Sequence, residues 1–174
     1  MADLQLVQDF VNTAALEQQR DEFRDTRGLV RWLALHRLAG PHARARDVDV
    51  AEARAVREAL RELLRANNGI DVDEAAAATT LDAAARRAGL TVRFAKGAIR
   101  LVPARGGVQG ALGNVLAAAA EAMADGSWQR LKACRADDCR WAFVDSARNH
   151  SRQWCDMRVC GNRQKARTFR ARHA

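Results

Sequence analysis

The chain has 174 residues, of which 48% are hydrophobic and 29% are charged. This composition is typical of a soluble globular protein and excludes wholesale disorder. The sequence contains no apolar run long enough to cross a membrane, and its first residues lack the basic start and apolar stretch of a signal peptide. We therefore expect no membrane span and a cytoplasmic location.

The net charge of +8 is distributed unevenly along the chain. Residues 1–127 contain 17 basic and 17 acidic side chains, whereas residues 128–174 contain 12 basic and 4 acidic ones, so the whole excess lies in the last part. Such an asymmetry is typical of a protein with a polyanionic partner. The composition shift at 126–128 predicts two domains, residues 1–126 and residues 127–174.

Helical spacing of apolar residues dominates the first predicted domain. The predicted helices cover about residues 3–17, 26–39, 47–67, 73–87 and 108–124. Between residues 91 and 102, polar and apolar side chains alternate on both sides of Lys96-Gly97, which predicts a short β-hairpin. We therefore expect a mainly α-helical domain with one small hairpin.

All four cysteines lie in the second predicted domain, as two pairs with four residues inside each: Cys134, Cys139, Cys155 and Cys160. Because cytosolic thiols stay reduced, this spacing favours metal ligands over disulfides. Four thiolates complete a tetrahedral zinc shell and leave no position for water, which indicates one structural zinc ion. Disulfides, an iron–sulfur cluster and a redox switch are the alternatives, and His150 is a less favoured substitute ligand.

Sequence patterns around the cysteines predict a treble-clef-like finger, built from a β-hairpin and a helix. Residues 140–145 alternate as a strand with Trp141 and Phe143 on one face, and residues 151–154 are predicted to return as its partner. Residues 161–172 contain good helix formers. A unit of roughly 45 residues with few large apolar side chains does not offset a chain entropy of ~1.5 kcal/mol per residue, so we expect folding to need zinc.

The predicted terminal helix carries Arg163, Arg167 and Arg170 at positions i, i+4 and i+7, which form one stripe. Guanidinium groups match both phosphates and guanine edges. A merely solvated helix is the alternative, but the coincidence with a zinc module favours nucleic acid, and DNA over RNA because a run of stacking aromatics is missing. The predicted DNA-binding residues are Arg148, Arg152, Arg158, Arg163, Lys165, Arg167 and Arg170.

The CGNR motif at residues 160–163, after WCDM at 154–157, resembles the CGNR zinc-finger family. The DFVNT motif at residues 9–13 and RWL at 31–33 resemble the ABATE-type stress-response regulator domain that accompanies this finger. The resemblance implies a stress-induced transcription regulator with a helical sensing domain and a DNA-binding finger. All four cysteines match the family pattern, whereas Gln8 stands where the family usually has an apolar residue.

Polar side chains of the first two predicted helices indicate a candidate site for a small-molecule effector. Asp9, Asn12 and Thr13 lie on adjoining helical turns, and we expect them near Trp32 and His36. The alternative is that these polar groups cap or bridge buried helices and that His36 is a core residue.

We interpret the chain as a DNA-binding transcription regulator and not as an enzyme. The first domain is expected to sense an effector or to form a homodimer. A nucleophile elbow, a phosphate-binding glycine loop and an HExxH motif are all missing from the sequence. One alternative is a protein-interaction adaptor whose zinc module docks an acidic partner. A less favoured alternative is an enzyme that uses Asp9 and His36 as acid and base.

Overall fold

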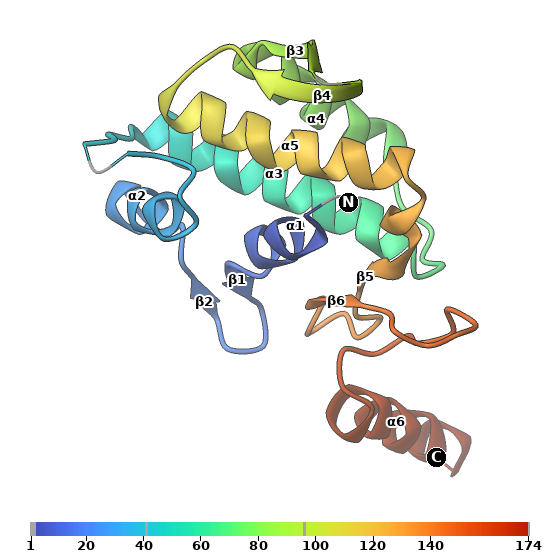
Figure 1. Cartoon of the computed structure of the whole chain (residues 1–174). Coiled ribbons are helices and arrows are strands. Elements are labelled where there is room, and N and C mark those ends of the chain that lie inside the picture. The colour runs from blue at the N-terminus through green and yellow to red at the C-terminus, as the bar shows by residue number, and fades with distance from the viewer. Residues whose placement is uncertain (1–2, 41, 96, 174) are drawn as a thin grey trace.

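The computed structural model describes residues 3–40, 42–95 and 97–173, which form helices and three short antiparallel strand pairs (Figure 1). In chain order the elements are α1 (Leu4–Val11), β1 (Ala14–Ala15), β2 (Arg20–Asp21), α2 (Thr26–Leu35), α3 (Asp47–Ala66), α4 (Glu74–Ala88), β3 (Leu90–Ala95), β4 (Ala98–Pro103), α5 (Gly107–Ala124), a 3₁₀ turn (Ser127–Arg130), β5 (Leu131–Ala133), β6 (Ala142–Val144), a π-helical turn (Met157–Gly161) and α6 (Asn162–His173). The mainly α-helical fold class is therefore confirmed.

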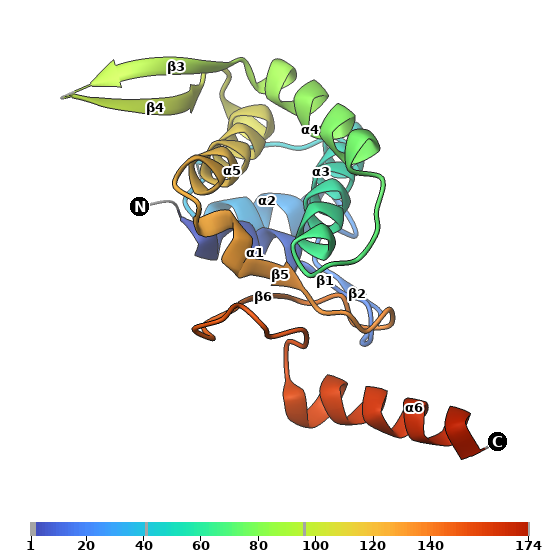
Figure 2. The same ribbon diagram turned by 90° about the vertical axis from the view of Figure 1, so that its right-hand side faces the viewer.

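The helices α1 to α5 form one body around a shared hydrophobic core. Figures 1 and 2 show α3 and α5 side by side, with α4 and the β3–β4 hairpin on one side and α1 and α2 on the other. Phe10, Phe23 and Trp32 meet in the core with ring centroids 5.5 to 5.6 Å apart. Small residues let α5 pack closely, since a Cβ atom on Gly113 would lie 2.8 Å from the Pro103 Cβ atom.

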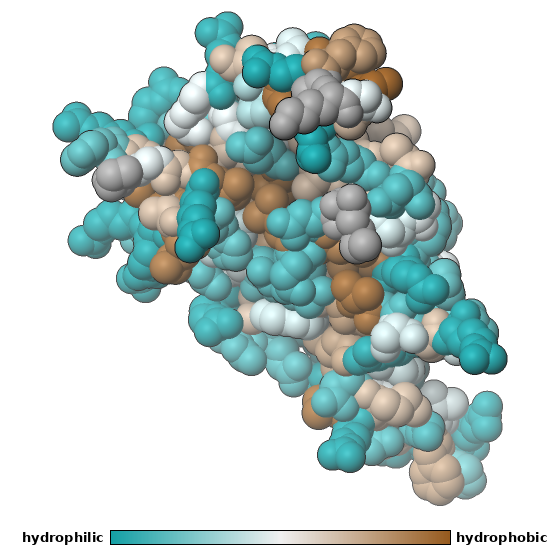
Figure 3. Space-filling model, in the orientation of Figure 1, coloured by the Kyte–Doolittle hydropathy of each residue, from teal (hydrophilic) through white to brown (hydrophobic). Residues whose placement is uncertain are grey.

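The three long helices and the hairpin of this body confirm the sequence prediction. Gly89 ends α4 in the left-handed conformation, with φ 63°, as a glycine after a helix commonly does. Thr91 pairs with Val102 and Phe94 pairs with Ile99 in the hairpin. Lys96 of the predicted turn lies outside the described residues. The hairpin leaves Phe94 and Ile99 exposed, and Figure 3 shows hydrophobic side chains at the top of the view, where β3 and β4 lie.

Two predicted helix ends are wrong. The first helix ends at Val11 and not near residue 17, because the chain turns at Asn12 and then forms β1, which pairs with β2. The second helix ends at Leu35 and not near residue 39, and Arg37 takes a left-handed backbone angle, φ 57°. A residue in that conformation cannot continue a right-handed helix.

The last part of the chain forms β5, β6 and α6. The prediction that residues 151–154 pair with the strand at 140–145 is wrong, because β6 pairs with β5 instead, in the register Leu131 to Val144. The terminal helix is confirmed, and Figure 2 shows α6 projecting away from the body. Among the residues that the structure describes, no helix combines the length and apolar character needed to span a membrane.

Candidate metal centre

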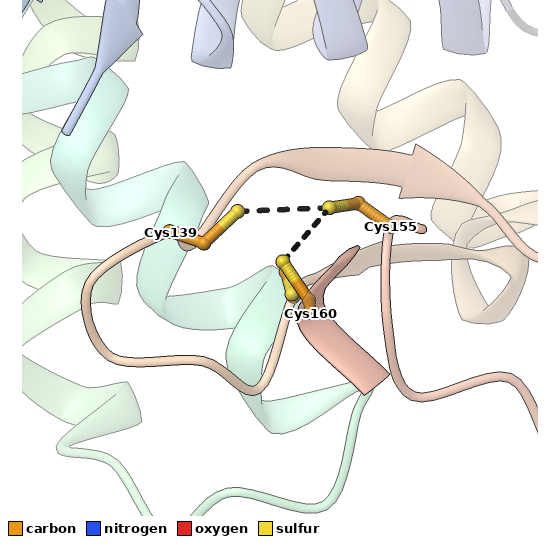
Figure 4. Close-up of side chains that lie close together, drawn as sticks. Cys139, Cys155 and Cys160 are labelled. Carbon is orange, nitrogen blue, oxygen red and sulfur yellow. Dashed lines mark hydrogen bonds between the residues drawn. The ribbon is translucent and has the colours of Figure 1, made fainter. Parts of the chain in front are cut away.

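Four cysteines from three different segments converge in the last part of the chain. Cys134 directly follows β5, Cys139 ends the turn after it, Cys155 lies in an extended segment, and Cys160 lies in the π-helical turn before α6. Their sulfur atoms all lie within 4.8 Å of one another. The Cys155 sulfur is 3.6 Å from that of Cys139 and 3.7 Å from that of Cys160, and Figure 4 shows these side chains pointing toward one another.

These distances fit a tetrahedral zinc ion. Zinc–sulfur bonds of about 2.3 Å place the four sulfurs of a tetrahedron about 3.8 Å apart. Four thiolate ligands would leave no coordination position for a substrate or a water molecule, so the donor set fits a structural ion. The predicted zinc ligands are therefore brought together as the sequence spacing required.

Mutual influence of the thiols also favours a cation. Hydrogen bonds from Cys139 and Cys155 hold the pKa of Cys134 to about 2, well below the usual value of a thiol. The interaction with Cys134 raises the pKa of Cys139 to about 12, and Cys134 and Cys139 raise the pKa of Cys155 as well. One thiolate therefore opposes the ionisation of the next, and a divalent cation removes that conflict by replacing the protons.

A small hydrophobic cluster shields the sulfurs from water. Phe143 of β6 is 5% exposed and packs beside Cys134 and Cys160, while Trp141 and Trp154 cover the cluster from the edge. Trp141 and Phe143 thus contribute to the same cluster, as predicted for one face of this strand. Apolar surroundings strengthen the attraction between thiolates and a metal ion because they lower the local dielectric constant.

The CGNR motif has a physical explanation in this site. Cys160 supplies a thiol, and a side chain on Gly161 would collide with Met157 of the same turn. The Arg163 guanidinium lies 3.3 Å from the Cys160 sulfur and 2.8 Å from a carboxylate oxygen of Glu17 in the β1–β2 turn. These two partners, Glu17 first, raise the pKa of Arg163 above its ordinary value. A cation beside a metal-binding sulfur orients the ligand and offsets its charge.

Asparagine side chains fasten the finger to the helical body. The Asn12 side chain exchanges two hydrogen bonds of 2.8 and 2.9 Å with the backbone of Ala142 in β6. From the end of α3, Asn67 donates to the carbonyls of Trp128 and Leu131, and Asn68 donates to those of Ala133 and Gln153. The sequence analysis missed these roles, because each bond joins residues at least 61 positions apart.

We expect Asn12→Ala to lower the free energy of unfolding by about 2–4 kcal/mol, because it leaves a buried N–H and a buried C=O of Ala142 without partners. Urea denaturation of the zinc-loaded protein measures this loss. Gln5→Ala removes an exposed amide from the same helix and is the matched control, with an expected change within about 0.5 kcal/mol. Equal stabilities of the two variants would contradict the fastening role of Asn12.

A buried ion pair organises the segment between the cysteine pairs. Lys132 Nζ lies 2.8 Å from Asp145 Oδ2, and both side chains are almost fully buried. Asp145 also accepts hydrogen bonds from the backbone N–H groups of Ala147 and Arg152. Residues 146–154 therefore follow a fixed course without forming the predicted strand, and the sequence analysis did not identify this pair.

The structure divides the predicted DNA-binding residues into two groups. Arg163 and Arg167 pair with Asp138, and Arg152 lies 4.9 Å above the ring of Phe143. Within the described part of the chain, no ion pair engages the other four: Arg148, Arg158, Lys165 and Arg170.

The predicted effector residues lie together, but two of them are already engaged. Asp9, Asn12, Trp32 and His36 line an open hollow of about 280 Å³ beside Trp141. The hydrogen bonds to β6 occupy the amide of Asn12. A list of the remaining contacts shows Thr13 1% exposed and bonded to the Phe10 carbonyl and to Arg57, and His36 stacked on Trp32 with ring centroids 4.0 Å apart. Bridging of buried elements thus explains Asn12 and Thr13 without a ligand.

A four-cysteine centre joined to a helical body defines a zinc-finger protein. The model of the CGNR zinc finger family matches residues 130–173, and the model of the ABATE family, described as "Putative stress-induced transcription regulator", matches residues 4–126. The chain therefore belongs to the ABATE family and carries a C-terminal CGNR zinc finger, whose clustered cysteines fit one structural zinc ion. No curated protein matches the chain.

Proposed function

We propose that this protein is a transcription regulator that binds DNA through its zinc-anchored terminal helix. The observation that carries the proposal is the state of α6, which has no buried side chain and contains five Lys and Arg residues but no acidic residue. Membership of the ABATE family supports a regulatory role. A basic helix that the rest of the protein leaves uncovered suits a polyanionic partner.

The way in which α6 is held supports this role. A free helix of 12 residues is marginally stable in water. Here Cys160 anchors its N-terminal end, and Asp138 pairs with Arg163 and Arg167 on one side. An α-helix of this kind fits the major groove of B-DNA, and Figures 1 and 2 both show α6 extending away from the body. Zinc would thus keep a basic rod in a fixed direction.

The ion pairs also indicate which side chains are available for DNA. Arg163 and Arg167 hold the helix to the finger, whereas Lys165, Arg170 and Arg172 are exposed and lack an acidic partner among the described residues. We assign the DNA contacts of α6 chiefly to these three residues. In this assignment Arg163 and Arg167 act by orienting the helix.

We expect the zinc-loaded protein to bind a short duplex of mixed sequence with an affinity that falls steeply with salt. Neutralising about five phosphates gives a slope of log K against log[salt] near −4.5. Replacement of Lys165, Arg170 and Arg172 by alanine should make the slope shallower by about 3. Fluorescence anisotropy across a salt series measures both values.

The matched control replaces Arg86, Arg93 and Arg100 by alanine, which removes the same charge from exposed positions on α4 and the β3–β4 hairpin. Figure 1 shows these elements at the opposite end of the molecule from α6. The control should retain the wild-type slope. A wild-type protein that does not bind duplex DNA at low salt would contradict the proposal and favour the adaptor alternative.

In the same proposal, residues 1–126 act as a sensing or dimerisation domain, residues 127–174 act as the finger, and the protein is not an enzyme. The two residues considered as acid and base have other partners, since Asp9 accepts a hydrogen bond from Gln5 and His36 stacks on Trp32. A DNA partner in a bacterial-type regulator implies a cytoplasmic location.

A further inference from the structure

Four arginines surround a hollow of about 520 Å³ on the helical body. Arg20 lies in β2, Arg24 precedes α2, and Arg27 and Arg31 lie on α2. The last three are spaced at i, i+3 and i+7, so they follow one side of the helix. We call Arg20, Arg24, Arg27 and Arg31 the arginine hollow.

Acidic neighbours leave most of this charge uncompensated. Asp21 is engaged by Arg57, with nitrogen–oxygen distances of 2.7 and 2.9 Å. Asp25 caps α2 by accepting a hydrogen bond of 2.8 Å from the Gly28 N–H, and its other oxygen is 3.6 Å from Arg24 Nε. Glu22 also lines the hollow. In the part of the chain that the structure describes, Arg20, Arg27 and Arg31 have no ion pair.

The hollow lies beside the zinc finger. The β1–β2 turn connects the two, because Glu17 of this turn pairs with Arg163 of α6 at 2.8 Å, and Arg20 follows three residues later. Both ribbon views show the β1–β2 hairpin extending from the body toward α6 (Figures 1 and 2). Hydrophilic side chains cover the left of the molecule in Figure 3, where α2 lies. The total charge of residues 1–127 is zero, so only the folding of the chain reveals this local excess.

We propose that the arginine hollow is a second contact surface for the phosphodiester backbone of the DNA duplex that α6 binds. This inference rests on the proposed function. Guanidinium forks match phosphate oxygens, and neither a helix nor a strand projects from the hollow to enter a groove. Contacts of this kind position a duplex without reading its sequence. The helical body would thereby fix the direction of the DNA relative to the finger.

The test replaces Arg20, Arg27 and Arg31 by alanine in the full-length, zinc-loaded protein. Binding to a short mixed-sequence duplex is followed by fluorescence anisotropy over a salt series. The slope of log K against log[salt] should become shallower by about 3, since each lost phosphate contact removes roughly 0.9. The Arg86, Arg93 and Arg100 variant described above is the charge-matched control and should retain the slope.

A second variant separates binding from stability. Lysine at positions 20, 27 and 31 keeps the charge and should recover most of the slope, whereas a loss caused by altered folding would not depend on charge. Equal slopes for the alanine variant and the control would overturn the inference, while steep salt dependence in both would leave the proposed function intact. Saturable binding of inorganic phosphate that is lost in the alanine variant, with an unchanged DNA slope, would also overturn it and assign the hollow to a small anion.

Discussion

Removal of zinc is expected to unfold the finger while α3, α4 and α5 remain folded. Structural zinc contributes about 10–16 kcal/mol to the folding of small metal-binding units. The hydrophobic cluster around the sulfurs is small and consists mainly of the cysteines themselves, so it cannot replace that contribution. Hydrogen exchange should show lost protection for residues 134–161 after chelation, and retained protection in the three long helices.

The variant Cys160→Ser provides the corresponding test without a chelator. It should lack stoichiometric zinc by elemental analysis and show the same loss of protection in the finger. Added zinc should restore the chelated wild type but not the variant, which separates metal loss from damage by the chelator. A finger that keeps its protection without metal would refute the structural role of zinc.

The second large effect is expected from Asp145→Asn. This change leaves the Lys132 ammonium buried without a counter-charge, and breaking a buried pair in this way costs about 3–5 kcal/mol. Urea denaturation of the zinc-loaded protein measures the loss. Asp137→Asn removes the same charge from an exposed position of the finger, with 80% of its side chain accessible, and should change stability little.

The same pair predicts a pH dependence. Burial alone raises the pKa of Asp145, but hydrogen bonds from Lys132 and from two backbone amides outweigh burial and lower the pKa below its ordinary value of 3.8. The unfolded chain therefore binds a proton more readily than the folded one, so this carboxylate stabilises the fold above pH 3.8 and its contribution is lost as the pH falls through the lowered pKa. The difference in stability between wild type and Asp145→Asn should shrink under acid, and a constant difference would contradict the role of the ionised pair.

Local signals predicted the parts of the fold whose stability is local. Helices α3, α4 and α5 have long periodic patterns, and Gly89 marks the end of α4. The periodic pattern of the first helix continues past Val11, but the pairing of β1 with β2 overrides it. Register with a distant strand leaves no mark on the sequence nearby, which also explains the wrong partner predicted for β6.

Spacing along the chain predicted the metal ligands, because two close cysteine pairs carry their chemistry in the sequence itself. The contacts that position the finger could not be predicted in this way. Asn12 and Ala142 are separated by 130 positions, and an asparagine at the end of a helix looks the same whether or not its amide reaches a distant carbonyl. Lys132 and Asp145 likewise resemble ordinary surface charges until the fold buries them.

The hydrophobic core of the helical body includes Trp128, Leu131, Ala133 and Ala142, which all come from beyond the compositional boundary near residue 126. A fragment cut at that boundary would carry a greasy underside into water and would leave a dent in the remaining body. Grafting this finger onto another protein would accordingly require a host surface that reproduces the asparagine clamps and the apolar seat beneath them.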